Sequence, residues 1–180
     1  SGRCEYLAFG KYADGGLRED GSGMDITGSG TGLTSGLAKV AFNADNGGRL
    51  ELGYEIVRDD AQRPLRADFA GLRGVLATRT YTLERQNLVL SYEFGNTTAM
   101  WNPSVQIAYN STDLYTGPMP GATDAYSGET TSFTGKIQNE FQVANGTVNA
   151  GLDFYSDVAD INGEGTAVFF AEEKATNIGL

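Results

Sequence analysis

Apolar and polar residues alternate with a period of two in many segments of this chain. The clearest segment is 49–57, which places Leu50, Leu52, Tyr54 and Ile56 on one side and Arg49, Glu51, Gly53 and Glu55 on the other. Successive side chains of a β-strand point to opposite faces, whereas a helix repeats every 3.6 residues. The pattern therefore predicts strands with one apolar and one polar face, and an all-β fold.

The alternation predicts seven strands and the start of an eighth. They cover residues 5–13, 35–44, 49–57, 78–94, 104–116, 133–143, 148–157 and 177–180. The connectors between successive strands alternate in length, long then short, along the whole chain. In an antiparallel meander this order places all short turns on one rim and all long loops on the other. That asymmetry is typical of transmembrane barrels, and less typical of soluble ones. The sequence thus predicts an antiparallel up-and-down transmembrane β-barrel arrangement of about eight strands.

Two local features carry further predictions. Asn145-Gly146 separates two alternating runs, and this pair favours a two-residue type I′ turn in which both residues have positive φ. Along 78–94 the apolar residues change parity near Gln86-Asn87. Because one extra residue reverses the facing of every residue after it, the change predicts a β-bulge there.

The two faces of the predicted strands differ in a way that suggests lipid on one side. In the hairpin 141–154 one face carries Phe141, Val143, Val148, Ala150, Leu152 and Phe154, and the other carries Gln142, Asn149 and Asp153. A strand face in bulk water usually has many Lys and Glu residues. The polar face here has mainly Gln, Asn, Gly and Thr, with scattered single charges. This composition suits a wet or plugged lumen, so we expect the apolar face to meet lipid. No run approaches the roughly 20 apolar residues of a membrane-spanning helix.

Composition excludes several kinds of function. The formal net charge is −10, which disfavours a nucleic-acid partner. Because the chain has no histidine, it can form neither a Ser-His-Asp nor a Cys-His arrangement. The acidic pairs Asp59-Asp60 and Glu172-Glu173 are adjacent in sequence, and neighbours on a strand point apart. We therefore predict neither a catalytic site nor a metal site, and a protein that is not an enzyme.

Arginine is unevenly distributed. Six of the nine arginines fall between residues 58 and 85, namely Arg58, Arg63, Arg66, Arg73, Arg79 and Arg85. In a structural interpretation they pair with Asp59, Asp60, Asp68 and Glu84 and order a long loop. In a functional interpretation they form a cationic patch toward an anionic ligand or a partner's carboxylates inside the lumen. The sequence leaves both open.

Several stretches resemble the barrel of TonB-dependent outer-membrane receptors, especially those that take up haem. The motif RPLRADF at 63–69 is similar to a loop that follows an early barrel hairpin of that family. YTLERQNLVLSYEF followed by WNPSVQIAYNSTDLY is similar to the next hairpin, and EEKATNIGL to the lead into a later strand. The resemblance implies energised import of an iron complex, haem or a siderophore, across the outer membrane of a Gram-negative bacterium.

The resemblance also implies partners and a ligand site. Residues 1–180 would form a single segment of a larger barrel, without the plug domain, and the iron complex would be cargo rather than a resident cofactor. The partners would be outer-membrane lipid, the rest of the receptor barrel and plug, and the TonB complex through the parent chain. The expected ligand-binding residues, in loops and lumen, are Arg58, Arg63, Arg66, Arg73, Tyr115 and Tyr126, and either tyrosine could coordinate iron.

Two alternatives remain at this stage. The first is a self-contained, eight-stranded soluble barrel that binds a ligand as part of a surface lipoprotein, a group faintly echoed in YLAFGKY and GTAVFFAEE. The second is a small closed membrane barrel with a structural or adhesive role. In a soluble barrel the apolar side chains would converge in a dry interior, so the direction in which they face separates this alternative from the other two.

Overall fold

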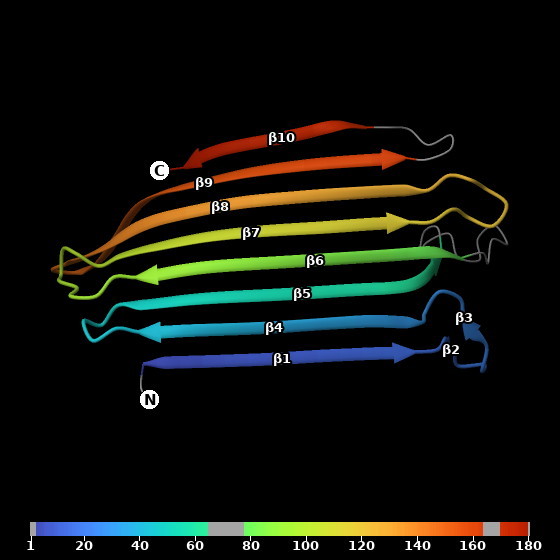
Figure 1. Cartoon of the computed structure of the whole chain (residues 1–180), viewed down its shortest axis with the longest axis horizontal. Coiled ribbons are helices and arrows are strands. Elements are labelled where there is room, and N and C mark those ends of the chain that lie inside the picture. Colours follow the sequence, from blue (N-terminus) through green and yellow to red (C-terminus); the bar gives the residue numbers. More distant parts are fainter. Residues whose placement is uncertain (1–2, 65–77, 164–169, 180) are drawn as a thin grey trace.

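A computed structural model describes residues 3–64, 78–163 and 170–179 of the chain, and every regular element in it is a β-strand (Figure 1). The strands are β1 (Cys4–Gly15), β2 (Arg18–Glu19), β3 (Asp25–Ile26), β4 (Thr31–Asn43), β5 (Arg49–Pro64), β6 (Thr78–Glu93), β7 (Pro103–Thr116), β8 (Tyr126–Val143), β9 (Gly146–Gly163) and β10 (Phe170–Gly179). The described residues include no helix that is long and apolar enough to cross a membrane.

Eight of the strands form one antiparallel sheet in the order β1-β4-β5-β6-β7-β8-β9-β10, and β2 and β3 form a small separate pair. Connections of 5, 9 and 2 residues join β4 to β5, β6 to β7 and β8 to β9 at one end of the sheet. At the other end the connections from β1 to β4, β5 to β6, β7 to β8 and β9 to β10 have 15, 13, 9 and 6 residues (Figure 1). Within the described residues each strand contacts only its immediate neighbours, and β1 and β10 are the two edges. The predicted all-β fold and its antiparallel meander are confirmed. The difference between the two rims is smaller than predicted, because β8, β9 and β10 extend into segments that were expected to be long loops.

One face of the large sheet is almost entirely apolar over its middle and its short-turn half. Hydrogen-bonded partners across the strands place two rows of side chains on it. The first row is Val40, Leu52, Leu90, Ile107, Gly135 and Phe154, and the second is Phe42, Leu50, Tyr92, Val105, Ile137 and Leu152. We call this side the apolar face and the opposite side the polar face.

The apolar face is open rather than packed. Val40 is 56% exposed, Leu52 46% and Leu90 40%, and Ala41 and Ala125 are the only buried hydrophobic residues among those the structure describes. Along β5 the apolar-face residues 50, 52 and 54 are exposed, whereas the polar-face residues 51, 53 and 55 are half-buried. This is the reverse of a strand lying over a dry core. In the described part of the chain, the dry interior that a self-contained soluble barrel requires is absent.

The polar face carries an ion-pair network at its short-turn end. The Arg49 guanidinium donates to Glu5 at 2.9 Å, to Glu51 at 3.1 Å and to the side-chain oxygen of Asn43 at 3.0 Å, and Lys39 lies 3.4 Å from Glu51. These residues come from β1, β4 and β5, so charged side chains link three neighbouring strands across this face.

The predicted β-bulge near Gln86-Asn87 is wrong. The pairing of β6 with β5 and with β7 runs through both residues without a register shift. Tyr81 and Leu83 therefore lie on the polar face, opposite in facing to Leu88. The parity change reflects a real exchange of polarity between the faces, because toward the long loops the polar face becomes apolar and the apolar face becomes charged.

Several predicted boundaries also change. Residues 58–64 and 126–131, expected in loops, belong to β5 and β8, and β9 continues to Gly163. In these segments apolar and polar residues no longer alternate as they do in the middle of the strands, but the backbone pairing with the neighbouring strands continues. The 141–154 hairpin is confirmed, with Phe141 opposite Val148, yet its turn is Ala144-Asn145 and neither Asn145 nor Gly146 has positive φ. The type I′ turn is therefore wrong.

The first long connector contains an ordered turn between β2 and β3. One carboxylate oxygen of Asp20 accepts hydrogen bonds from the backbone N–H of Ser22 at 2.8 Å, the Ser22 hydroxyl at 2.6 Å and the backbone N–H of Met24 at 3.0 Å. These bonds favour the charged carboxylate, the Ser22 hydroxyl most, and they hold the pKa of Asp20 below its ordinary value. Asp20 thus fixes the tip of this connector.

Candidate functional site

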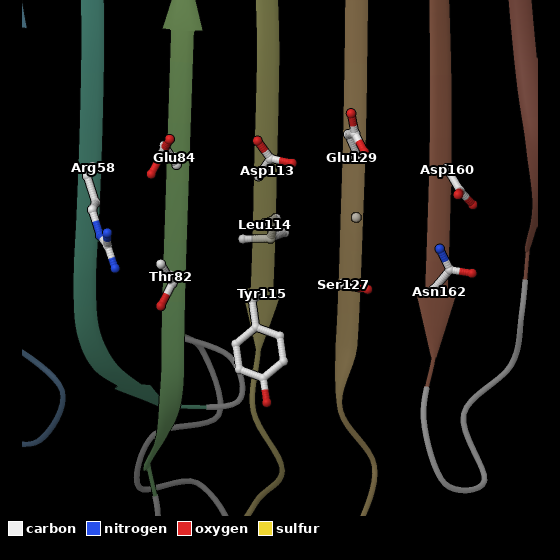
Figure 2. Close-up of a pocket in the computed structure, with 11 residues that line it drawn as sticks. Arg58, Thr82, Glu84, Asp113, Leu114, Tyr115, Ser127, Glu129, Asp160 and Asn162 are labelled. Atoms are coloured by element: carbon white, nitrogen blue, oxygen red, sulfur yellow. The ribbon is translucent and has the colours of Figure 1, made fainter.

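Two of the predicted ligand residues, Arg58 and Tyr115, line one shallow groove near the long-loop rim (Figure 2). The groove has a volume of about 400 Å³ and crosses β5 to β9. The alternation of the strands places Arg58 and Tyr115 on the same side as Leu50 and Leu88, so the groove opens on the apolar face, beyond its apolar rows. We call it the outer groove.

The outer groove is mainly acidic. Arg58 on β5 begins a row of directly paired neighbours that continues through Glu84, Asp113, Glu129 and Asp160. Arg58 is more than half exposed and lies 3.6 Å from Asp60. With four carboxylates against one guanidinium in this row, the groove repels anions. No group of three or more acidic or cysteine side chains among the described residues is arranged to hold a metal ion.

Arg63 has a structural role on the polar face. One Nη donates to the backbone oxygens of Gly28 at 2.9 Å and Gly30 at 2.6 Å, and the other lies 3.2 Å from Asp59. Gly28, which has φ +75°, packs so closely on Pro64 that an added Cβ would lie 2.4 Å from the proline Cδ. Arg63 therefore ties the connector that carries β2 and β3 to the end of β5. Its pair with Asp59 belongs to the structural interpretation of the arginines, but the connector that it holds was not part of that interpretation.

Replacing Arg63 by methionine is expected to release that connector. The substitution removes three charge-assisted hydrogen bonds from a half-buried position, which costs about 1.5–3 kcal/mol locally. Hydrogen exchange of the amides in residues 17–30 should become faster. Arg58→Met is the matched control, since Arg58 is exposed and has a single 3.6 Å pair that is worth under about 1 kcal/mol. Equal exchange in the two variants would contradict the tethering role.

Tyr126 lies on the polar face, apart from Arg58 and Tyr115. Its ring is 5.9 Å from the guanidinium carbon of Arg79. Through Thr116 it shares a row with Tyr81, and the next row contains Leu83, Leu114, Gly128 and Ile161. We call Tyr81, Leu83, Leu114, Tyr126 and Ile161 the apolar belt.

The apolar belt is continuous across three strand gaps. Leu83 pairs directly with Leu114, and Ile161 lies within 3.9 Å of the Cβ position of Gly128, so its side chain covers that glycine. On β6 the polar face shows in order Arg79, Tyr81, Leu83 and Arg85, so a cationic residue lies on each side of the belt. Arg85 is also 3.7 Å from Glu55. A ligand that is mostly apolar and also carries anionic groups would fit this arrangement.

Sequence reasoning found only part of these arrangements. Arg66 and Arg73 lie outside the described residues. The acidic row and the apolar belt were both missed, because each forms only when strands far apart in sequence are placed in register. The signal was present in the parity change at 78–94, which was attributed to a bulge.

Comparison with known proteins identifies related chains. The "Heme transporter BhuA" of Brucella ovis is 30% identical over 139 residues, which are 76% of this chain and 20% of the relative. The proteins of the same name from Brucella abortus and Brucella suis match equally well, with 30% identity over the same length. The chain thus spans about a fifth of the length of the curated relatives it matches. No protein-family model matches it, and no solved structure does so significantly.

These relatives are named as transporters, in agreement with the prediction that the chain is not an enzyme. The match covers 76% of a chain whose antiparallel strand order was predicted from the alternation of apolar and polar residues. The similarity to these transporters and the antiparallel sheet together support the resemblance of the chain to TonB-dependent receptors.

Proposed function

We propose that this chain forms part of the barrel wall of a receptor in the outer membrane of a Gram-negative bacterium and takes part in the import of an iron complex, with haem as the favoured ligand. The observation that carries the proposal is the exposed apolar face, which in this reading meets lipid. The remaining barrel strands, the plug and the TonB complex would be partners of the parent receptor.

The position of the apolar residues supports a membrane-spanning wall. On β5 the apolar-face run is Leu50 to Ile56, and on β9 it is Val148 to Phe154. Leu50 aligns with Leu152 across four strand steps, so the run shifts by four residues between the two strands. The apolar run therefore shifts by one residue for each strand crossed. One residue is about 3.3 Å along a strand and neighbouring strands are about 4.8 Å apart, so the strands are tilted by about 35° relative to the normal of the apolar band. Barrel strands are tilted by about this angle.

The choice of haem rests on the relatives' name and on the apolar belt. Haem has a flat, apolar ring and two carboxylates. The belt offers aliphatic and aromatic side chains on the face that would line the lumen. Arg79 and Arg85 lie at its two ends on β6, so one of them can meet the edge of the ring from which both carboxylates project. The outer groove suits haem poorly, because it is acidic and faces the lipid side. We therefore place the ligand at the belt rather than at Arg58 and Tyr115.

A binding titration tests this function. The full chain, purified in detergent micelles, is titrated with haem and followed by its absorbance band. Leu83→Ala removes part of the apolar belt and should weaken haem binding about tenfold, the effect of losing roughly two buried methylene groups. Leu88→Ala is the matched control on the same strand, because Leu88 lies on the apolar face. Its haem affinity should stay unchanged.

Competition and fractionation complete the test. A ferric siderophore that displaced haem from the wild-type chain at lower concentration would overturn the choice of haem. Equal affinity of the Leu83→Ala and Leu88→Ala variants would remove the belt as the ligand site. Recovery of the expressed chain in the soluble fraction, without detergent, would contradict the membrane location itself.

A further inference from the structure

The apolar face contains a second groove, on the opposite side of the sheet from the apolar belt. Its apolar lining comes from Val105, Ile107, Ile137, Leu152, Phe154 and Ile178 around Gly135. We call it the Gly135 groove. Gln106, Lys136 and Asp153 also border it, but strand alternation directs their side chains to the polar face. The side chains that surround the groove on its own face are therefore all apolar.

Gly135 explains why the face is hollow at this point. It is the one position without a side chain in the row between Ile107 and Phe154. The Phe154 ring lies over it, since an added Cβ would be 2.2 Å from a carbon of the ring, and the ring is 5.5 Å from that of Phe133. The ring thus covers the strand where a larger residue would place its own side chain, and Ile107 and Ile137 line the groove beside it.

We propose that the Gly135 groove seats one acyl chain of a glycerophospholipid. The inference rests on the proposed function, which turns this face toward lipid. The groove has a volume of about 400 Å³, and at roughly 30 Å³ per water-sized group it accepts about a dozen methylene groups. A lining without polar side chains gives no hydrogen bond to a polar ligand, so hydrocarbon is the chemistry it fits.

Charge on the same face selects phospholipid over a phosphorylated glycolipid. Toward the long loops the face ends in the acidic row with Glu84, Asp113 and Glu129, which repels phosphate groups at that rim. Toward the short turns the corresponding positions on β6 to β9 are Phe94, Pro103, Asn139 and Ala150, all uncharged. The seated chain therefore belongs to a lipid whose headgroup lies at the short-turn rim.

Native mass spectrometry of the full chain, released from detergent micelles that contain both phospholipid and lipid A, tests the proposal. We expect the wild type to keep one phospholipid per chain. Leu152→Phe fills the groove and should reduce the retained fraction at least fivefold. Leu50→Phe is the matched control, because Leu50 lies in the same register row and is similarly exposed but outside the groove. It should retain the lipid like the wild type.

A phospholipid with a photoactivatable acyl chain gives an independent measurement on the wild-type chain. Crosslinks at Ile107 and Ile137 should exceed those at Leu50 at least fivefold. Even labelling over the apolar face, retention of lipid A in place of phospholipid, or unchanged retention in Leu152→Phe would each overturn the groove proposal and leave the membrane wall intact. Absence of labelling anywhere on the face would instead contradict the proposed function.

Discussion

Leu90→Lys is expected to destabilise the chain in lipid vesicles by about 2–4 kcal/mol. Leu90 lies midway along the apolar run of β6 and is 40% exposed, so in a membrane its side chain would meet hydrocarbon. A lysine near the bilayer midplane of a barrel costs about this much. The measurement is the free energy of unfolding in urea, with the chain reconstituted in vesicles.

The control is the next residue. Ser91→Lys places the same charge one position along β6, where the side chain points to the polar face beside Glu51. Its unfolding free energy should stay within about 1 kcal/mol of the wild type, since a partly solvated ion pair contributes little. If both lysines cost the same, the two faces would meet the same environment and the membrane orientation would be wrong.

Gly135→Val is expected to give the second large effect. The new side chain would occupy the space of the Phe154 ring, which would have to leave its position over the strand. Overpacking of this kind costs about 1–3 kcal/mol. Gly53→Val on β5 should be neutral or slightly stabilising, because an added Cβ there lies 3.7 Å from the nearest atom and valine favours strands.

A double-mutant cycle identifies the cause. In a Phe154→Ala background the ring is absent, so Gly135→Val should cost close to nothing, and the coupling energy should be at least about 1 kcal/mol. An unchanged cost in that background would mean that the backbone near Gly135, rather than the Phe154 ring, rejects the side chain.

Sequence alternation predicted the strand positions, the antiparallel order and the identity of the apolar face. These properties depend on the polarity of each residue and its neighbours, and segments such as 49–57 and 148–154 alternate without interruption. The alternation predicted less at the long-loop ends, where the two faces exchange polarity. There the strands continue by backbone pairing, which does not depend on the polarity of the side chains. Residues 58–64 were therefore assigned to a loop, although they belong to β5.

The candidate site was predicted less well than the fold. The predicted ligand residues at the long-loop rim do not all lie together. Arg58 is on the apolar face, whereas Arg63 and Tyr126 are on the polar face, and each has a different partner. Facing depends on register, and register joins residues as far apart as Leu83 and Ile161. The local pattern of a single sequence does not show which residues of distant strands are paired.

The neighbour-only contacts of the sheet have a consequence for how it forms and comes apart. Each pairing closes a loop between consecutive strands, so the entropy lost at any one step is small and no step waits for a distant partner. Such a sheet can grow by adding one hairpin to an existing edge, much as a repeat protein propagates from a formed unit. Pulled from one end, it should unravel in a series of force peaks with one hairpin released at each.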